Sequence, residues 1–364
     1  MVRTDSIVIG LFVFLSGCKP AFNPQDYFAF PIEEVHGIPV VELDSSQEAS
    51  ISGIGDLWRF EVIDTLVVYY KKGIGQTMYH VAGLKSGEDL GHFCIRGRGP
   101  GEVLATNPSF QIVDGNVVVF DLLKGQYFEL NIDKSLKAGN TKYDRQVQLQ
   151  DYAGRTFQHP RKVSENRVLL FDSATVPESN SLSHLPAFAL YDLSSGNLLR
   201  DYSCFQQIPY IHKREKDYLP QELLTMDLCV DSSGQTICFV MNMFPLIGFL
   251  DIETGKARGI WLNDKPLFSE RGSRHFHFMS CESNGENIFA LYQGVISGKN
   301  EEETPSELYV FDWYGNVKKR IQLDKHYYWI SLYKDKLYLQ YYSYINNEWE
   351  ARFCSQNIDE INNL

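Results

Sequence analysis

The sequence predicts an all-β fold, a six-bladed β-propeller of four-stranded antiparallel blades. Two observations predict it: a tight-turn hairpin pattern that recurs six times, and a second hairpin type, built around an Asp and a Gly, that follows several of these. Composition agrees, because 13% of the residues are aromatic, with 21 Tyr and 23 Phe, and aromatic residues favour strands. The best helical candidate, Asp217 to Met226, is short.

The recurring pattern is an apolar run, a short polar turn and a second apolar run, which is typical of a hairpin. Its six occurrences are Val62 to Val68, Ile112 to Phe120, Lys162 to Leu170, Cys229 to Ile237, Ser283 to Ala290 and Leu332 to Leu339. Dividing roughly 310 residues by six gives about 52 per unit, near the length of a propeller blade. Six blades around a central channel therefore fit better than a β-sandwich, which would not explain six similar units.

The second hairpin type places an Asp after an apolar residue and a Gly a few positions later. It occurs at Phe120 to Gly125, Tyr191 to Asn197, Leu250 to Lys256 and Phe311 to Asn316. We expect the Asp to accept hydrogen bonds from turn amides and the Gly to supply a positive φ.

One strand-like segment, Ile38 to Leu43, precedes the first unit. The last unit, from about Tyr327 to Phe353, would otherwise end in an unprotected strand edge. We therefore expect the ring to close by pairing between the two ends of the chain, with residues 38–43 completing the last blade.

The chain starts with a short apolar run, Ile7 to Leu15, followed by Ser16-Gly17-Cys18. The run is too short for a membrane helix, which needs about 20 apolar residues. The pattern resembles the signal peptide and lipobox of bacterial lipoproteins, and an ordinary cleaved signal with an incidental cysteine is the alternative. The resemblance implies cleavage before Cys18 and lipidation of Cys18.

This pattern sets the expected domain organisation. We expect a signal peptide over residues 1–17, a lipid anchor and proline-containing tether over 18–35, and the propeller over 36–364. Several acyl chains hold a protein firmly on a membrane. The resemblance therefore implies a protein anchored in the cell envelope, at the outer membrane, with periplasmic and surface-facing orientations both open.

Charge and cysteine content exclude some classes of function. The net charge of −12 argues against a nucleic-acid partner, because phosphate binding needs clustered Lys and Arg.

The six cysteines other than Cys18 are scattered, without a CxxC pair, at positions 94, 204, 229, 238, 281 and 354. This pattern is typical of buried free thiols, and Cys229 and Cys238, on either side of one turn, are the pair best placed for a disulfide.

A Gly-rich segment, Arg96-Gly97-Arg98-Gly99-Pro100-Gly101-Glu102, follows the first unit. Placed after a first blade and downstream of a lipobox, it resembles the six-bladed β-propeller (TolB-like) lipoproteins of Bacteroidetes. The resemblance implies the fold and the compartment, and almost nothing about activity.

The same segment is the first candidate binding site. Its amides could cradle an anion, with Arg96 and Arg98 adding positive charge and Glu102 pairing with either. It lacks the ending of a phosphate loop, and the alternative is a crossover between two blades.

The second candidate site is His275 and His277, which share one face of a strand. With no third ligand fixed by spacing, they favour a hydrogen-bonded pair over a metal site. Aromatic residues from His326 to Trp329 and from Tyr341 to Trp349 could stack a sugar or peptide, but more often fill space between blades.

The sequence carries no nucleophile elbow, zinc motif or calcium loop. We therefore expect no cofactor, no metal-dependent catalysis, and a binding or scaffold module for a protein, peptide or glycan, engaged through one face with long loops at 205–222 and 294–306. The alternative is a hydrolase or lyase with its site at the channel mouth. Titratable groups with perturbed pKa values converging in the channel would favour the enzyme, and an aliphatic channel would favour the binding module.

Overall fold

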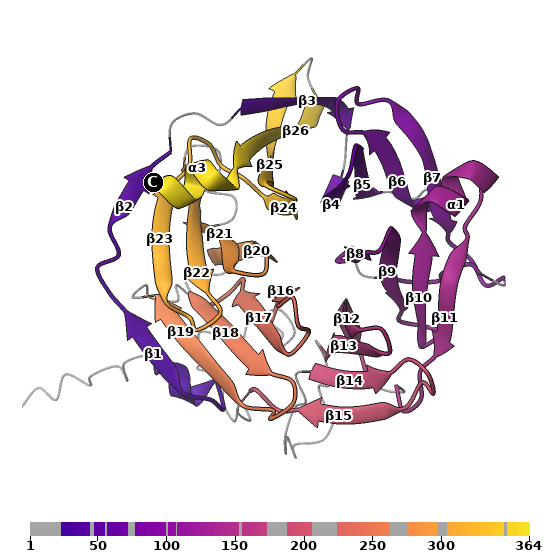
Figure 1. Ribbon diagram of the computed structural model, residues 1–364, viewed down its shortest axis with the longest axis horizontal. Helices are drawn as coiled ribbons and strands as arrows, with labels where there is room; N and C mark the ends of the chain where they lie inside the picture. Colours follow the sequence, from indigo (N-terminus) through magenta and orange to yellow (C-terminus); the bar gives the residue numbers. More distant parts are fainter. Residues whose placement is uncertain are drawn as a thin grey trace, which may run out of the picture.

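The computed structural model describes residues 23–43, 47–54, 57–71, 77–99, 101–106, 108–152, 155–172, 188–205, 224–262, 275–296, 304–345 and 348–364. Their strands form six sheets arranged in a ring (Figure 1). The predicted all-β, six-bladed propeller is therefore confirmed.

Each blade has four antiparallel strands. Blades one to three are β4 (Leu57–Ile63), β5 (Leu66–Lys71), β6 (Thr77–Gly83) and β7 (Asp89–Ile95); β8 (Gln111–Val113), β9 (Asn116–Asp121), β10 (Gln126–Asn131) and β11 (Tyr143–Gln148); and β12 (Phe157–Ser164), β13 (Arg167–Asp172), β14 (Phe188–Asp192) and β15 (Leu198–Tyr202).

Blades four to six follow the same order, except that the outer strand of the last blade comes from the other end of the chain. They are β16 (Met226–Val230), β17 (Thr236–Met241), β18 (Leu246–Asp251) and β19 (Ala257–Leu262); β20 (His275–Ser283), β21 (Asn287–Ile296), β22 (Glu307–Asp312) and β23 (Val317–Gln322); and β24 (Trp329–Tyr333), β25 (Lys336–Ile345), β26 (Glu348–Asn357) and β3 (Gln47–Ile54). The innermost strands are β4, β8, β12, β16, β20 and β24 (Figure 1).

All six tight-turn hairpins join an innermost strand to the second strand of its blade. Three of the four Asp/Gly hairpins join a third to a fourth strand, whereas Phe120 to Gly125 joins the second to the third. The expected turn chemistry is present: Asp312 accepts hydrogen bonds from the amides of Tyr314 and Asn316, both at 2.9 Å, and Gly315 has φ 87°.

Ring closure follows the predicted principle but uses a different strand. Antiparallel β3 completes blade six by pairing with β26, while β2 (Val40–Glu42) pairs in parallel with β23 as a fifth strand of blade five. The expectation that residues 38–43 complete the last blade is therefore wrong. The physical reason is length, because the eight-residue β3 covers more of the exposed edge of β26 than the three-residue β2 could.

The described part of the expected tether, residues 23–35, packs against the propeller. Phe28 is fully buried, with its ring edge-on to Phe244 at 5.3 Å between centroids, and β1 (Ile32–Val35) pairs in parallel with β19. Pro24 begins the short 3₁₀ helix η1 (Pro24–Asp26), a position where proline is tolerated. Cys18 and the expected signal peptide lie outside the described residues, in which no helix has the length and apolarity to cross a membrane.

Two short α-helices, α1 (Ile132–Ala138) and α3 (Ile358–Asn363), were not anticipated. Asn131 caps the start of α1, where its side chain accepts the Lys134 N–H at 2.8 Å, and Gly139, with φ 62°, caps its end. Such caps stabilise a helix too short to form by propensity alone.

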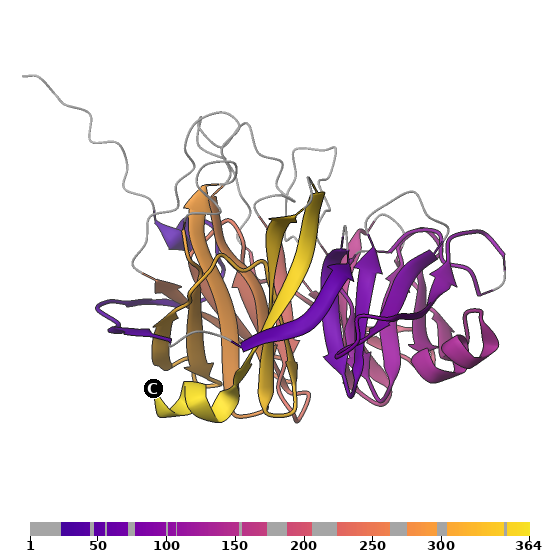
Figure 2. The ribbon, with the colours of Figure 1, turned by 90° about the horizontal axis from the view of Figure 1, so that it is seen from above.

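One face of the ring carries both short helices, α1 and α3, and the tight turns. We call it the turn face; its tight turns are at residues 64–65, 114–115, 165–166, 231–235, 284–286 and 334–335. Both helices lie at the lower side of the ring in Figure 2. Most of the candidate helix at 217–226 and of the predicted loops 205–222 and 294–306 lies outside the described residues. The described end of the candidate helix, residues 224–226, leads through a turn into β16 and is not helical.

Candidate functional site in the propeller channel

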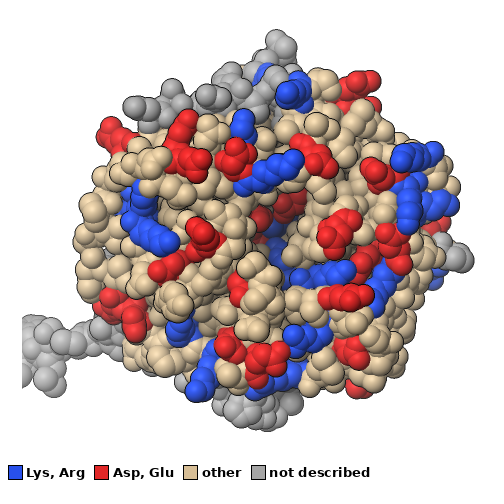
Figure 3. Space-filling view, viewed as in Figure 1, with Lys and Arg blue, Asp and Glu red and all other residues tan. Residues whose placement is uncertain are grey.

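A polar pocket of about 240 Å³ lies in the channel, and all six innermost strands contribute to its lining. The lining residues are Arg59, Glu61, Val62, Ile63, Phe110, Gln111, Ile112, Arg161, Leu228, Cys229, Val230, Glu282, Ser283, Leu332 and Tyr333. Because β16, β20 and β24 contribute their last residues, the pocket lies toward the turn face. That face is hollowed near its centre, where acidic and basic side chains both lie (Figure 3).

Strand geometry places the charges of β4 in this pocket. Side chains alternate between the two faces of a strand, so Arg59 and Glu61 share one face and Phe60 and Val62 the other. Phe60 packs edge-on against Phe353 of blade six. Burying the apolar face of β4 between blades therefore fixes Arg59 and Glu61 in the channel.

Asp227 of β16 lies at the centre of the charged network. Its Oδ1 accepts hydrogen bonds from Arg59 Nη1 at 2.7 Å and Arg161 Nη2 at 3.2 Å, and its Oδ2 accepts the Cys281 N–H at 3.1 Å. Burial acts to raise the pKa of Asp227, but Arg59, His159 and Arg161 outweigh it and hold that pKa well below its usual range. Asp227 is therefore ionised and links four blades.

Arg161 is committed to this framework. Besides Asp227, its guanidinium donates to the carbonyl oxygens of Leu228 at 2.8 Å, Pro160 at 3.1 Å and Phe110 at 3.4 Å. Its side chain is 3% exposed. These contacts leave Arg161 little capacity to bind an added anion.

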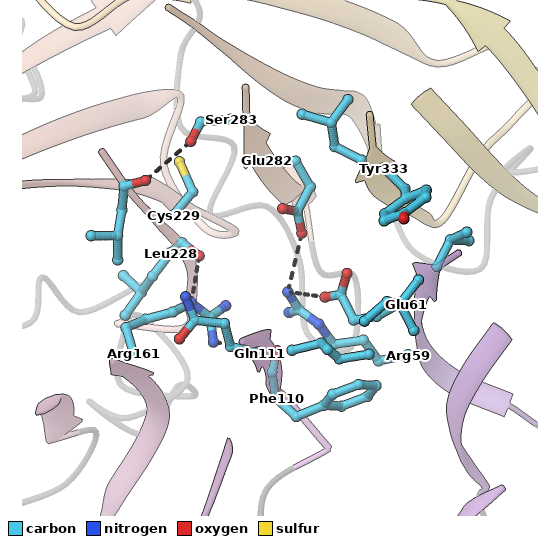
Figure 4. A pocket seen from close by; sticks show the side chains of 15 residues that line it. Arg59, Glu61, Phe110, Gln111, Arg161, Leu228, Cys229, Glu282, Ser283 and Tyr333 are labelled. Carbon is cyan, nitrogen blue, oxygen red and sulfur yellow. Dashed lines mark hydrogen bonds and ion pairs between the residues drawn. The ribbon is translucent and has the colours of Figure 1, made fainter. Parts of the chain in front are cut away.

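Glu61 and Glu282 approach Arg59 from two strands. Their Oε1 atoms lie 3.5 Å and 3.8 Å from Arg59 Nη2, and Figure 4 shows this guanidinium nitrogen facing both carboxylates. Ser331 Oγ donates to Glu61 Oε2 at 2.9 Å. The Glu282 side chain, at 20% exposed, is more open than that of Glu61 at 12% or Asp227 at 2%.

The protonation states follow from burial and neighbouring charges. Burial and the Glu61 carboxylate hold the pKa of Glu282 well above its usual range, while burial also raises the pKa of Glu61 against the opposing effect of Arg59. Burial lowers the pKa of His159, 3.7 Å from Asp227, below its usual value, so its imidazole is neutral near pH 7. The pocket thus combines the ionised Asp227 and the two arginines with two carboxyl groups whose pKa values are raised.

No family model matches this chain, and no curated protein matches its sequence. Among solved structures, a DUF4221 family member from Bacteroides vulgatus is similar, with a TM-score of 0.55, 10% identity, and coverage of 88% of this chain and 99% of that one. An exported-protein candidate from Bacteroides fragilis has a TM-score of 0.47 and 9% identity, with coverage of 90% and 99%. The likeness to the Bacteroides vulgatus protein establishes a shared fold only.

The predicted Gly-rich site lies elsewhere, in the crossover between β7 and β8. Arg96 and Arg98 are exposed, and none of the predicted residues of this segment lines the pocket. The Glu102 carboxylate accepts the Gly99 N–H at 2.7 Å, and a Cβ added at Gly97 would lie 2.0 Å from Glu102 Oε2. The cradle expected for an external anion therefore holds a carboxylate of the chain itself, a geometry that favours the crossover interpretation.

The predicted histidine pair is also outside the pocket. His277 is fully buried, with Nδ1 3.1 Å from the Tyr292 hydroxyl, and His275 lies in β20 with a side chain outside the described residues. Within the part of the chain that the structure describes, no three His, Cys, Asp or Glu side chains are placed to hold a metal ion.

Cys229 and Cys238 are directly opposite in the β16–β17 pairing, as expected from the turn between them. Both thiols are free and buried, as is Cys281 of the next blade. Burial holds the pKa of each of these three thiols well above its usual range, so they are unreactive in the folded protein.

The aromatic residues divide between packing and surface. Tyr327 is fully buried, whereas Tyr344 and Trp349 are 60% and 48% exposed, with ring centroids 5.2 Å apart. The Arg59 guanidinium carbon lies over the Trp329 ring, 5.5 Å from the ring centroid.

Sequence reasoning missed the channel residues Arg59, Glu61, Asp227 and Glu282. A usable signal was present, because each is a charged residue one to three positions before the apolar run that begins a predicted hairpin. Charged residues rarely enter a buried strand unless they are paired, so several such strands in one propeller indicate a charged channel.

Proposed function

We propose that the chain is a lipid-anchored extracytoplasmic binding module that receives a polar group of its partner in the channel pocket. The observation that carries this proposal is the pocket itself, in which the Glu282 carboxyl is the most open of the buried acids. Concave sites with a few convergent polar groups are the usual form of ligand sites. At about 240 Å³, the pocket suits a small moiety or the end of a longer chain.

The arrangement around Arg59 supports binding over catalysis. Two carboxylates that cleave a glycosidic bond must flank it with space between them. Here both Glu61 and Glu282 instead face the Arg59 guanidinium, at 3.5 Å and 3.8 Å (Figure 4). A substrate bond would have to displace a buried, ion-paired arginine.

The pocket is tested by filling it. Leu332→Trp places a large ring at the lining, and Leu123→Trp makes the same change at a side chain that is 67% exposed and outside the pocket. Amines, sugars, amino acids and short peptides are screened by ligand-observed NMR. We expect ligands to bind the parent and Leu123→Trp but not Leu332→Trp; equal binding to both variants would place the binding site elsewhere.

The enzyme remains a second candidate because of one observation, the raised pKa values of two neighbouring carboxyls, Glu61 and Glu282. Ligands from the screen are incubated with the protein and recovered. Chemical change that is lost in Glu282→Gln would establish a hydrolase or lyase, whereas recovery of every ligand unchanged supports the binding module.

The anchor rests on the Leu15-Ser16-Gly17-Cys18 motif. Replacing Cys18 with Ala should release the protein from membranes on cell fractionation and abolish incorporation of a fatty-acid label. Retention of the label by Cys18→Ala would refute lipidation at this cysteine. This outcome is independent of the pocket test.

A further inference from the structure

The charges of the pocket do not balance. Two guanidiniums, Arg59 and Arg161, face three carboxyl groups, Glu61, Asp227 and Glu282. The other titratable neighbours are His159 of β12, Cys229 of β16, Tyr333 of β24, and Lys334 and Asp64, an exposed pair of opposite charge beside Tyr333. His159 and Cys229 are uncharged near pH 7, and β8 contributes the uncharged Gln111. A buried excess of negative charge is costly unless a cation or a proton neutralises it.

The two arginines cannot accept an anionic ligand without breaking the framework. Arg59 Nη1 donates to Ser109 Oγ at 3.2 Å and to Asp227, and its Nη2 faces Glu61 and Glu282. Arg161 is bound to Asp227 and three carbonyl oxygens. The arginine donors are thus committed, and the other polar groups of the lining are the Glu61 and Glu282 carboxylates, the Gln111 amide and the Ser283 and Tyr333 hydroxyls.

Glu282 is the acceptor with room for a ligand. Its side chain is 20% exposed, and Arg59 is 3.8 Å away, longer than a hydrogen bond. By contrast, Glu61 accepts a hydrogen bond from Ser331, and Asp227 accepts several. Burial raises the pKa of both Glu61 and Glu282, which favours a proton on this pair when no cation is bound.

Resting on the proposed function, we infer that the pocket binds a positively charged ammonium group, carried by a small organic amine or a lysine side chain, in place of that proton. The ammonium donates hydrogen bonds to the Glu282 carboxylate, the neighbouring Glu61 carboxylate adds electrostatic attraction, and the displaced proton leaves to solvent. An ammonium is compact, with three donors on one nitrogen, which suits a small pocket lined by acceptors. Charge-assisted bonds of this kind are stronger than neutral ones.

Isothermal titration calorimetry tests the inference with 1,5-diaminopentane and 1,5-pentanediol, which have the same length but differ in charge. Parallel titrations with acetyl-Gly-Lys-Gly-amide and acetyl-Gly-norleucine-Gly-amide distinguish a lysine side chain from a free amine. We expect each amine to bind at least about tenfold more tightly than its neutral counterpart. Buffers with different ionisation heats should reveal proton release on amine binding, together with affinity that rises with pH until the carboxyl pair is ionised.

Glu282→Gln should remove both the preference for amines and the proton release. Glu350→Gln, which changes a carboxylate paired with Arg352 on β26 and outside the pocket, should retain both. Circular dichroism and thermal melting confirm that each variant is folded.

Three results would overturn the inference: equal affinity for amine and neutral probe, amine binding that survives Glu282→Gln, or no amine binding at millimolar concentration. Failure of this inference is distinguishable from failure of the proposed function. A neutral probe that binds the parent but not Leu332→Trp would keep the pocket as the binding site while excluding the ammonium.

Discussion

At the residue scale, Asp227 holds the channel together. It is 1% exposed and hydrogen-bonds Arg59 and Arg161 from two other blades. Removing one partner of a buried ion pair leaves the other charge uncompensated, which costs far more than the pair itself contributes.

Asp227→Asn should therefore lower the free energy of unfolding by about 3–5 kcal/mol. Asp335→Asn, in an exposed turn, makes the same change and should stay within about 0.5 kcal/mol of the parent. Urea unfolding at neutral pH measures both. Similar values for the two variants would show that the network contributes little to stability.

Glu282 gives the channel a pH dependence of the opposite sign to that of an ordinary ion-paired acid. Its pKa is raised in the folded protein, so the folded state binds more protons than the unfolded state above the usual glutamate pKa. The stability that this proton provides is fully present below the usual glutamate pKa of the unfolded chain. It is lost as pH rises through the raised pKa that Glu282 has in the folded protein. Asp227, with a lowered pKa, instead loses its contribution as pH falls below about 4.

Glu282→Gln should consequently flatten the decline in stability at rising pH, because glutamine is neutral throughout. Thermal melting of the parent and Glu282→Gln across pH 4 to about 9 checks this, with Glu350→Gln as the control. A decline of the same slope in all three proteins would contradict a protonated Glu282.

The sequence shows charged residues beside several hairpins but does not show that their side chains meet in one site. Arg59 and Asp227 are 168 positions apart, and no local spacing rule links residues on different blades. The segment from Arg96 to Glu102 drew attention because its motif is contiguous, yet its glycines make room for Glu102.

At the element scale, the hairpin turns also set the spacing between blades. Gly234, in the turn between β16 and β17, has φ 69°, and a Cβ there would lie 1.7 Å from the Val163 carbonyl oxygen of blade three. Gly115, in the corresponding turn of β8 and β9, has φ 73° with nothing within 4 Å of such a Cβ.

Gly234→Ala and Gly115→Ala share the cost of a positive φ, about 1 kcal/mol. Only Gly234→Ala adds a backbone clash between blades, which should lower the free energy of unfolding by about a further 1–3 kcal/mol. Chemical unfolding gives the free energy of unfolding of each variant, and the difference between the two values is the cost of the clash. Equal destabilisation would show that the blades move apart without cost at this contact.

Hairpins were predictable because their chemistry is local. The Asp and Gly of the turns from Tyr191 to Asn197 and from Leu250 to Lys256 fix the connection whatever the rest of the chain does. The use of β3 instead of β2 for closure was not predictable, because both are strand-like and only long-range pairing with β26 selects between them.

At the scale of the whole molecule, the ring is closed by pairing of β3 with β26. Glu48 lies opposite Cys354 in this register, and Ala49 lies opposite Phe353. Directly opposed residues of an antiparallel pair have Cα atoms about 4.5–5.5 Å apart, a separation that a disulfide can span.

Under mild oxidation, Glu48→Cys should therefore form a disulfide with Cys354, whereas Ala49→Cys, on the other face of the strand, should not. Mass spectrometry of a non-reduced digest identifies the linked peptides. A cross-link from position 49 but not 48 would mean that the register is shifted by one residue.

The carboxyl group of Glu282 is the group on which ammonium binding depends most, and its charge can be observed directly. Carbon-13 labelling of glutamate carboxyl groups, with Glu282→Gln to assign the signal, reports whether this group is protonated. At a pH where exposed glutamates are ionised, we predict a neutral Glu282 carboxyl in the free protein that becomes ionised when 1,5-diaminopentane is added. A carboxylate already ionised in the free protein, or one unchanged by the amine, would contradict the account.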